Sequence, residues 1–173
     1  LFFTFPSKAA AQAKAISKAG VGEQDMAGRR DLRGENIITI DGADSKDFDD
    51  AVSVKRLDNG NFLLGVHIAD VSHYIGEDSP LDKEALKRGN SVYIINQVVP
   101  MLPKELSNGI CSLNEGEDRL TLSVDMEITP EGDITEHNIY ESVIRSKHRM
   151  VYTDVSDIIE NDDRELAAKY SDI

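Results

Sequence analysis

The sequence contains a single cysteine, Cys111, among 173 residues, which excludes an internal disulfide. No set of Cys and His residues has the spacing of a zinc site, so the common zinc-binding modules are excluded as well. Long apolar runs are also missing. Residues 1–5 are mostly apolar, but this stretch is far too short to cross a membrane and lacks the charged flank of a signal peptide. We therefore expect a protein of the reducing cytoplasm with no membrane partner.

Positive charge is scarce. The chain has 19 Lys and Arg against 32 Asp and Glu, a formal net charge of -13 and a sequence pI near 4.6. This balance argues against a basic clamp on nucleic acid, and it fits a solvated acidic surface or a carboxylate site that binds cations. Apolar residues make up 40% of the chain, which is ordinary for a globular domain or a large piece of one. The missing initiator Met and the end at Ile173, inside a helical pattern, predict a fragment.

What the sequence has in abundance is aspartate, gathered in residues 39–52, TIDGADSKDFDDAV. An apolar run at residues 36–40 is typical of a strand that ends at Asp41, and a second strand is expected from Ala51. Burying unpaired like charges is costly, so the loop between them is either fully solvated or neutralised by cations. The aspartates that the two strands would bring close are Asp41, Asp47, Asp49 and Asp50.

The remaining pattern predicts an α+β fold: a mixed, largely antiparallel sheet with flanking helices. An Asn-Gly turn joins two of the expected strands, and a Pro-Glu-Gly-Asp turn joins another two. Residues 1–35 form a helix and a charged connector, and residues 36–173 form the main unit. The expected strands are 36–40, 51–57, 62–70, 91–95, 119–129 and 134–145, and the expected helices are 9–19, 80–88 and 153–173, with a helical turn at 104–106.

Several charged side chains allow two interpretations. The arginines of the connector, Arg29, Arg30 and Arg33, are able to contact phosphate, but pairing with nearby acids such as Asp31 and Glu35 is the favoured reading. His67 and His73 fall on or just after an expected strand. A histidine in such a place is more often packed and hydrogen-bonded than a ligand, although the nearby Asp70 leaves a supporting role in the site open.

Aspartate oxygens are hard ligands that suit Mg²⁺ or Mn²⁺. The spacing excludes an EF-hand, because a loop that opened at Asp47 would lack its central Gly and its closing Glu. A phosphoaspartyl phosphatase is disfavoured, since its Asp-x-Asp directly follows a buried strand, whereas Asp47 and Asp49 follow a polar turn. Four carboxylates are enough for one or two hard cations about 3.5–4 Å apart, as in sites that cleave phosphodiesters.

The run TIDGADSKDFDDAV, continued by GVHIADVSHYI, SVYIINQVVPMLPKELSNGICSL and RLTLSVDMEI, resembles the start of the catalytic (RNB) domain of the ribonuclease II family, in its ribonuclease R branch. The resemblance implies a processive, hydrolytic 3′-to-5′ exoribonuclease that needs Mg²⁺ and releases nucleoside 5′-monophosphates from single-stranded RNA ends. It places the family's metal ligands on Asp41, Asp47, Asp49 and Asp50, with Asp47 and Asp49 catalytic. It also places on Tyr93 the tyrosine that packs against the end of the bound RNA; an ordinary strand aromatic is the alternative.

Family members also carry OB-type RNA-binding domains and further catalytic-domain sequence, which residues 36–173 do not include. We therefore expect this fragment to be inactive alone. The alternative from another class is a non-catalytic acidic module on the same fold that binds divalent cations or a protein partner. The presence of all four aspartates favours the enzyme, because decay of the site would be expected to remove at least one of them.

Overall fold

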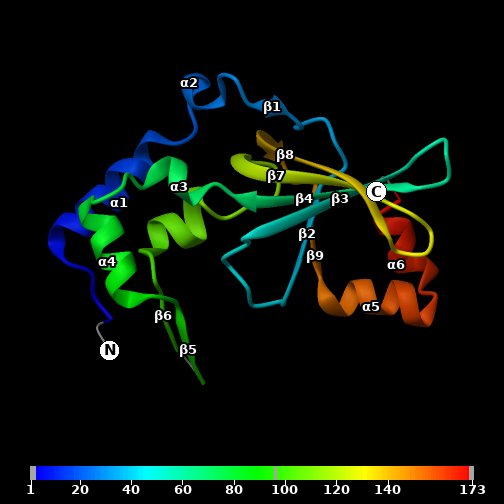
Figure 1. Cartoon of the computed structure of the whole chain (residues 1–173). Helices are drawn as coiled ribbons and strands as arrows, with labels where there is room; N and C mark the ends of the chain where they lie inside the picture. Colours follow the sequence, from blue (N-terminus) through cyan, green and yellow to red (C-terminus); the bar gives the residue numbers. More distant parts are fainter. Residues whose placement is uncertain (1–2, 96, 172–173) are drawn as a thin grey trace.

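A computed structural model describes residues 3–95 and 97–171 of the chain (Figure 1). Its centre is a seven-stranded sheet with the strand order β1-β8-β7-β4-β3-β2-β9, and a separate hairpin pairs β5 with β6. β1 lies parallel to β8 and β2 lies parallel to β9, whereas the other pairs are antiparallel. The predicted mixed, largely antiparallel sheet is thus confirmed. The strands are β1 (Arg30–Asp31), β2 (Ile38–Asp41), β3 (Asp50–Arg56), β4 (Phe62–Ala69), β5 (Val92–Ile94), β6 (Gln97–Val99), β7 (Asp118–Ile128), β8 (Ile134–Arg145) and β9 (His148–Val151).

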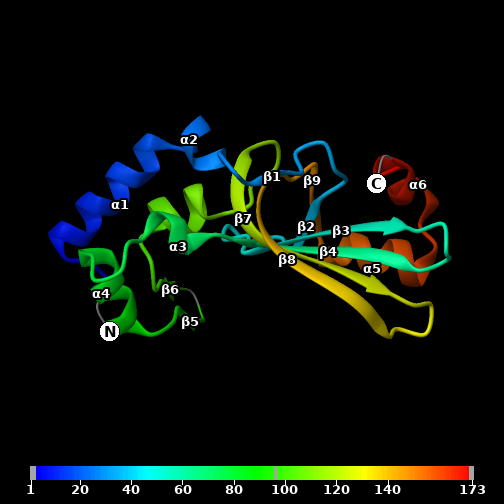
Figure 2. The ribbon, with the colours of Figure 1, turned by 45° about the horizontal axis from the view of Figure 1, so that its top comes forward.

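Helices gather at the two ends of the sheet. Figures 1 and 2 show α1, α3 and α4 together at one end and α5 and α6 at the opposite end. The helical elements are α1 (Ser7–Ala19), α2 (Glu23–Met26), α3 (Val71–Tyr74), α4 (Pro80–Arg88), the wide turn η1 (Leu106–Ile110), α5 (Tyr152–Asn161) and α6 (Arg164–Lys169). No helix among the described residues is long and apolar enough to cross a membrane.

Local signals in the sequence explain where these elements begin and end. The Ser79 hydroxyl accepts a hydrogen bond from the backbone N–H of Asp82 at 3.2 Å, and Pro80 opens α4, as predicted. Gly89 ends the helix at φ 78°, a left-handed conformation that glycine adopts without strain. The Asn59-Gly60 turn joins β3 to β4, and β4 is central between β3 and β7, also as predicted.

The predicted apolar face of the β7–β8 hairpin is buried only at one end. Leu120 on β7 and its partner Val143 on β8 are each 2% exposed, whereas Leu122 on the same face is 49% exposed. The opposite, polar face is buried as well, with Thr121 and Ser123 at 0% and 1% exposure. The reason is that the connector lies over this face: β1 pairs with β8, and the Arg29 guanidinium donates to the Thr121 carbonyl at 3.3 Å.

The connector arginines form ion pairs, as favoured from the sequence, but mostly with distant partners. Arg33 pairs with the neighbouring Asp31 at 2.7 Å, as expected. Arg29, by contrast, reaches Asp70 at 2.6 Å, and Arg30 reaches Asp125 at 3.0 Å. The two long-range pairs tie the connector to β7 and to the end of β4.

Two expectations for the second half need correction. The short strand at residues 91–95 is half of a hairpin whose other half, β6, was missed because only three residues of it are paired. The helical pattern at 153–173 is two helices, broken where Asp162 takes the left-handed conformation at φ 50°. Residues 172–173 of that pattern lie outside the described residues, as do residues 1–2 of the apolar N-terminal stretch.

Candidate metal centre

The predicted aspartate loop joins two neighbouring strands of the central sheet. β2 ends at Asp41, and β3 begins at Asp50, one residue earlier than predicted. The antiparallel register pairs Ile38 with Val52, so the end of β2 and the start of β3 lie side by side. The loop therefore begins and ends at the same end of two adjacent strands, so Asp41 at its start lies close to Asp50 at its end.

The loop is tied down by its buried member, Phe48, which is 5% exposed and belongs to the core. The Phe48 N–H donates to the Ser112 hydroxyl at 3.0 Å, and the Phe48 carbonyl accepts from the Leu113 N–H at 2.9 Å. On its far side, the Asp49 carbonyl accepts from the Ala69 N–H at 3.0 Å. These three backbone contacts fix the carboxylates of Asp47 and Asp49 on either side of Phe48.

Arg149 on β9 holds the first half of the loop. Its guanidinium donates to the Ala43 carbonyl at 2.6 Å and to the Ser45 carbonyl at 3.2 Å, and it stacks over the Phe48 ring at 4.9 Å from the centroid. No pattern in the sequence pointed to Arg149. No strand was expected at residues 148–151, and β9 becomes a neighbour of β2 only through its parallel pairing.

The four predicted aspartates are close enough to repel one another. Burial raises the pKa of the Asp41 carboxyl, and repulsion by Asp50 and Asp47 adds to the rise, while Arg149 opposes it. Burial and repulsion by Asp47 and Asp50 also raise the pKa of the Asp49 carboxyl. Mutual repulsion of this kind is relieved by a bound cation.

The donor set fits a hard divalent cation, since it consists only of carboxylate oxygens. The four side chains lie near one another but do not point at a common position. Among the described residues, no three His, Cys, Asp or Glu side chains form a group able to hold a metal ion. The structure thus brings Asp41, Asp47, Asp49 and Asp50 to one loop without closing a coordination sphere around a single point.

Tyr93 lies beside this loop. Its ring stands on β5 with 69% exposure, so it is not a core aromatic. Its hydroxyl donates to a carboxylate oxygen of Asp47 at 3.1 Å. The same two residues line a largely apolar cavity of about 410 Å³, together with Ile68, Met101 and Leu102. We refer to this space as the apolar cavity.

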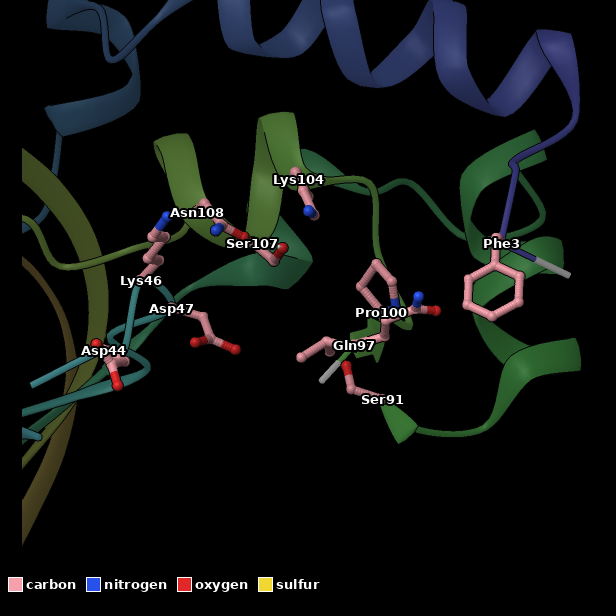
Figure 3. Close-up of a pocket in the computed structure, with 11 residues that line it drawn as sticks. Phe3, Asp44, Lys46, Asp47, Ser91, Gln97, Pro100, Lys104, Ser107 and Asn108 are labelled. Atoms are coloured by element: carbon pink, nitrogen blue, oxygen red, sulfur yellow. Dashed lines mark hydrogen bonds between the residues drawn. The ribbon is translucent and has the colours of Figure 1, made fainter. Parts of the chain in front are cut away.

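A second space, the polar cavity, also borders Asp47 and has a volume of about 370 Å³ (Figure 3). Lys46 and Asp47 of the loop form one wall, and Lys104 extends into it from the segment before η1. Neither lysine could be singled out from the sequence, because nothing in their spacing links position 46 to position 104.

Neither histidine belongs to the site. His67 is 1% exposed and hydrogen-bonded to the Ser123 hydroxyl at 2.7 Å and to the Ser53 hydroxyl at 3.1 Å, which confirms it as a packed residue. His73 contacts Arg29 at 3.3 Å and Asp25 at 3.1 Å. Both rings therefore serve the scaffold around β4.

Residues 29–172 match the family described as the RNB domain. The chain belongs to this family. Ribonuclease R of Thermotoga maritima is 59% identical over 157 residues, which are 91% of this chain and 22% of that relative. The expected resemblance to the ribonuclease R branch is therefore confirmed.

Solved structures give the same family. Mycoplasma genitalium RNase R in complex with ribose-methylated single-stranded RNA superimposes with a TM-score of 0.84 at 32% identity, over 96% of this chain and 27% of that one. Yeast Ssd1, described as a pseudonuclease, superimposes with a TM-score of 0.74 at 25% identity, over 86% of this chain and 19% of that one. This chain thus spans only about a fifth to a quarter of the length of the relatives and solved structures that it matches.

Proposed function

We propose that this chain supplies the carboxylate part of the active site of a longer 3′-to-5′ exoribonuclease, which releases nucleoside 5′-monophosphates from single-stranded RNA. The observation that carries the proposal is the aspartate loop of an RNB domain, with all four carboxylates at one sheet edge and Tyr93 hydrogen-bonded to one of them. Support for RNA as the substrate comes from the related RNase R, whose structure was solved with single-stranded RNA.

Asp41, Asp47, Asp49 and Asp50 would hold Mg²⁺, with Mn²⁺ as the other suitable ion. The bound ion supplies Lewis-acid polarisation of the phosphate and lowers the pKa of water. The backbone contacts of Phe48 and Asp49 keep the carboxylates in place against their mutual repulsion.

Tyr93 orients the substrate in this proposal. Its exposed ring offers a face on which the terminal base or sugar packs, and its hydroxyl bond to Asp47 fixes the ring relative to the carboxylates. Hydrolysis adds water across the bond between phosphorus and the 3′ oxygen. The 3′ oxygen leaves with a proton on the shortened RNA, and the 5′-phosphate stays on the released nucleotide.

The test is an assay of the longer protein on a labelled single-stranded RNA with a free 3′ end, the same RNA with a blocked 3′ end, and the matching DNA. We expect Mg²⁺-dependent release of nucleoside 5′-monophosphates from the first substrate alone. Comparable release from DNA would contradict the substrate. Binding of RNA or protein without hydrolysis in Mg²⁺ or Mn²⁺ would favour the non-catalytic acidic module. The specific observation behind this alternative is the similarity to yeast Ssd1, which is described as a pseudonuclease.

The cytoplasm is the proposed location. The support is the free, buried thiol of Cys111, which is 3% exposed and suits a reducing compartment. Fractionation of cells that express a tagged longer protein would test this.

A further inference from the structure

The polar cavity contains positive charge that the described part of the chain does not neutralise. The connector arginines Arg29, Arg30 and Arg33 are each paired with a carboxylate. Lys46 and Lys104 are both exposed, and within the described residues neither side chain forms an ion pair or a hydrogen bond. Two unpaired ammonium groups on one cavity of a chain with net charge -13 favour a ligand that carries negative charge.

The lysines are accompanied by a neutral donor. Ser107 and Asn108, on η1, line the same wall of the cavity as Lys104 (Figure 3). The Ser107 hydroxyl donates to Oδ1 of Asn108 at 2.9 Å, and this bond orients the Asn108 amide group. Hydroxyl and amide groups beside ammonium groups are the usual partners of phosphate oxygens. This part of the cavity therefore suits a phosphate group.

The opposite end of the cavity is aromatic. Figure 3 shows the Phe3 ring on the far side of Gln97 and Ser91 from Lys46 and Asp47. The ring is 56% exposed, so it has a face available for stacking. A charged end and an aromatic end across about 370 Å³ match the two ends of a nucleotide.

The carboxylates of Asp44 and Asp47 also line the cavity and disfavour a bare anion. They accept hydrogen bonds from hydroxyl groups, so they suit the ribose that joins a phosphate to a base. The combination discriminates between inorganic phosphate and a nucleotide, and it favours the nucleotide.

We propose that the polar cavity binds a ribonucleoside 5′-monophosphate, with its phosphate on Lys46 and Lys104 and its base on Phe3. The proposal rests on the proposed function, of which this nucleotide is the product. The polar cavity shares Asp47, Ser91 and Ser107 with the apolar cavity beside Tyr93, so a released nucleotide has a short path from one space to the next.

The test is calorimetric titration of the longer protein with AMP, in EDTA and without RNA, so that neither a metal ion nor turnover contributes. Adenosine, ribose 5-phosphate and inorganic phosphate are titrated in parallel. We expect AMP to bind more tightly than any of these three. Lys46→Gln and Lys104→Gln should each weaken AMP binding by about two- to fivefold, the range expected for the loss of one exposed charged contact.

The control is Lys14→Gln, which removes the same charge from an exposed position of α1 that does not line the cavity. It should leave AMP affinity unchanged. Phe3→Ala should weaken AMP and leave ribose 5-phosphate unaffected. Absence of AMP binding, equal binding of inorganic phosphate, or equal affinities of both cavity-lysine variants and the control would overturn the proposal.

RNA hydrolysis by the same preparation, measured after Mg²⁺ is added, separates the two proposals. Lysine-dependent AMP binding without hydrolysis would refute the exoribonuclease and leave the nucleotide site standing. RNA hydrolysis together with an AMP affinity that is unchanged in both lysine variants would refute the proposed nucleotide site and leave the exoribonuclease proposal intact.

Discussion

Asp49 is the residue at which the proposed chemistry is most directly tested. Its backbone carbonyl is fixed by the hydrogen bond from the Ala69 N–H, and its side chain lies among repelling carboxylates. In the longer protein, Asp49→Asn should slow single-turnover hydrolysis by about a hundredfold or more, since a charge close to the transition state is lost. RNA affinity should stay nearly unchanged, because it depends on many phosphate and stacking contacts. Both quantities are measured on one labelled oligonucleotide.

Asp58→Asn is the matched control for that variant. It removes the same charge from the exposed turn at the other end of β3 and should change neither quantity. If affinity fell in step with the rate for Asp49→Asn, the residue would act in folding or binding, and the catalytic role would move to another aspartate of the loop.

His67 makes stability depend on pH. Burial lowers the pKa of its imidazole from 6.5 to about 4, against a weaker opposing effect of Asp125 and Glu35. Because the folded pKa is below the unfolded one, the stability from neutral His67 is complete above pH 6.5 and is lost as pH falls toward 4. By proton linkage, the free energy of unfolding falls by about 3 kcal/mol over this range.

Urea unfolding of this chain at several pH values should show this fall in the free energy of unfolding. It should shrink in His67→Gln and persist in His137→Gln, whose histidine is exposed on β8; equal slopes in all three proteins would disprove it.

The loop between β2 and β3 is the element that should bind the metal ion. We expect this chain to bind Mg²⁺ or Mn²⁺ weakly, and to prefer them over Zn²⁺, because the available ligands are carboxylates without Cys or His. Calorimetry should detect binding that is lost in Asp41→Asn/Asp50→Asn. The double variant Asp58→Asn/Asp133→Asn removes two exposed turn carboxylates and should bind as the unchanged chain does. Identical Mg²⁺ titrations for both double variants would refute the assignment.

Strand β4 passes close to its neighbours at Gly65. A Cβ at this position would lie 2.4 Å from the Ser53 hydroxyl oxygen and 2.9 Å from Nε2 of His67, two atoms that are hydrogen-bonded to each other. Gly65→Ala should therefore lower the free energy of unfolding by about 1–3 kcal/mol through overpacking. Gly76→Ala, where a Cβ meets nothing within 4 Å, is the control. Thermal or denaturant unfolding measures both, and equal stabilities would show that Ser53 and His67 adapt freely.

Elements with local signals were predictable from the sequence, and elements that depend on distant pairing were not. The Ser79 cap and the Asn59-Gly60 turn each act within a few residues, so α4 and the β3–β4 hairpin were expected correctly. The position of the aspartate loop followed from the two strands that flank it. The buried face of β7, the support from Arg149 and the cavity shared by Lys46 and Lys104 depend on segments far apart in the chain, about which a single sequence carries no pairing information.

At the scale of the whole molecule, one face of the sheet is apolar and open. The register places Ile68 beside Leu122 and, further along the same face, Val124 beside Ile139. Ile68, Leu122 and Ile139 are 46%, 49% and 62% exposed. The other face is buried at Thr121 and Ser123. Leu120 lies on the same face as Leu122 but is only 2% exposed, so the open area begins at Leu122. A contiguous exposed apolar face of this kind marks a contact surface.

We expect the rest of the proposed longer protein to cover that face, since this chain spans 22% of the length of its Thermotoga maritima relative. The isolated chain should then enhance the fluorescence of an apolar dye such as ANS and self-associate as its concentration rises, and the longer protein should do neither. Leu122→Thr and Ile139→Thr should reduce both effects in the isolated chain, because each removes exposed apolar area without disturbing the buried face. Leu86→Thr is the control, since Leu86 is 80% exposed but lies on α4, away from the sheet. Dye titration and sedimentation at a series of concentrations measure the two effects. Equal dye binding by the chain and the longer protein would mean that this face stays open in the complete molecule.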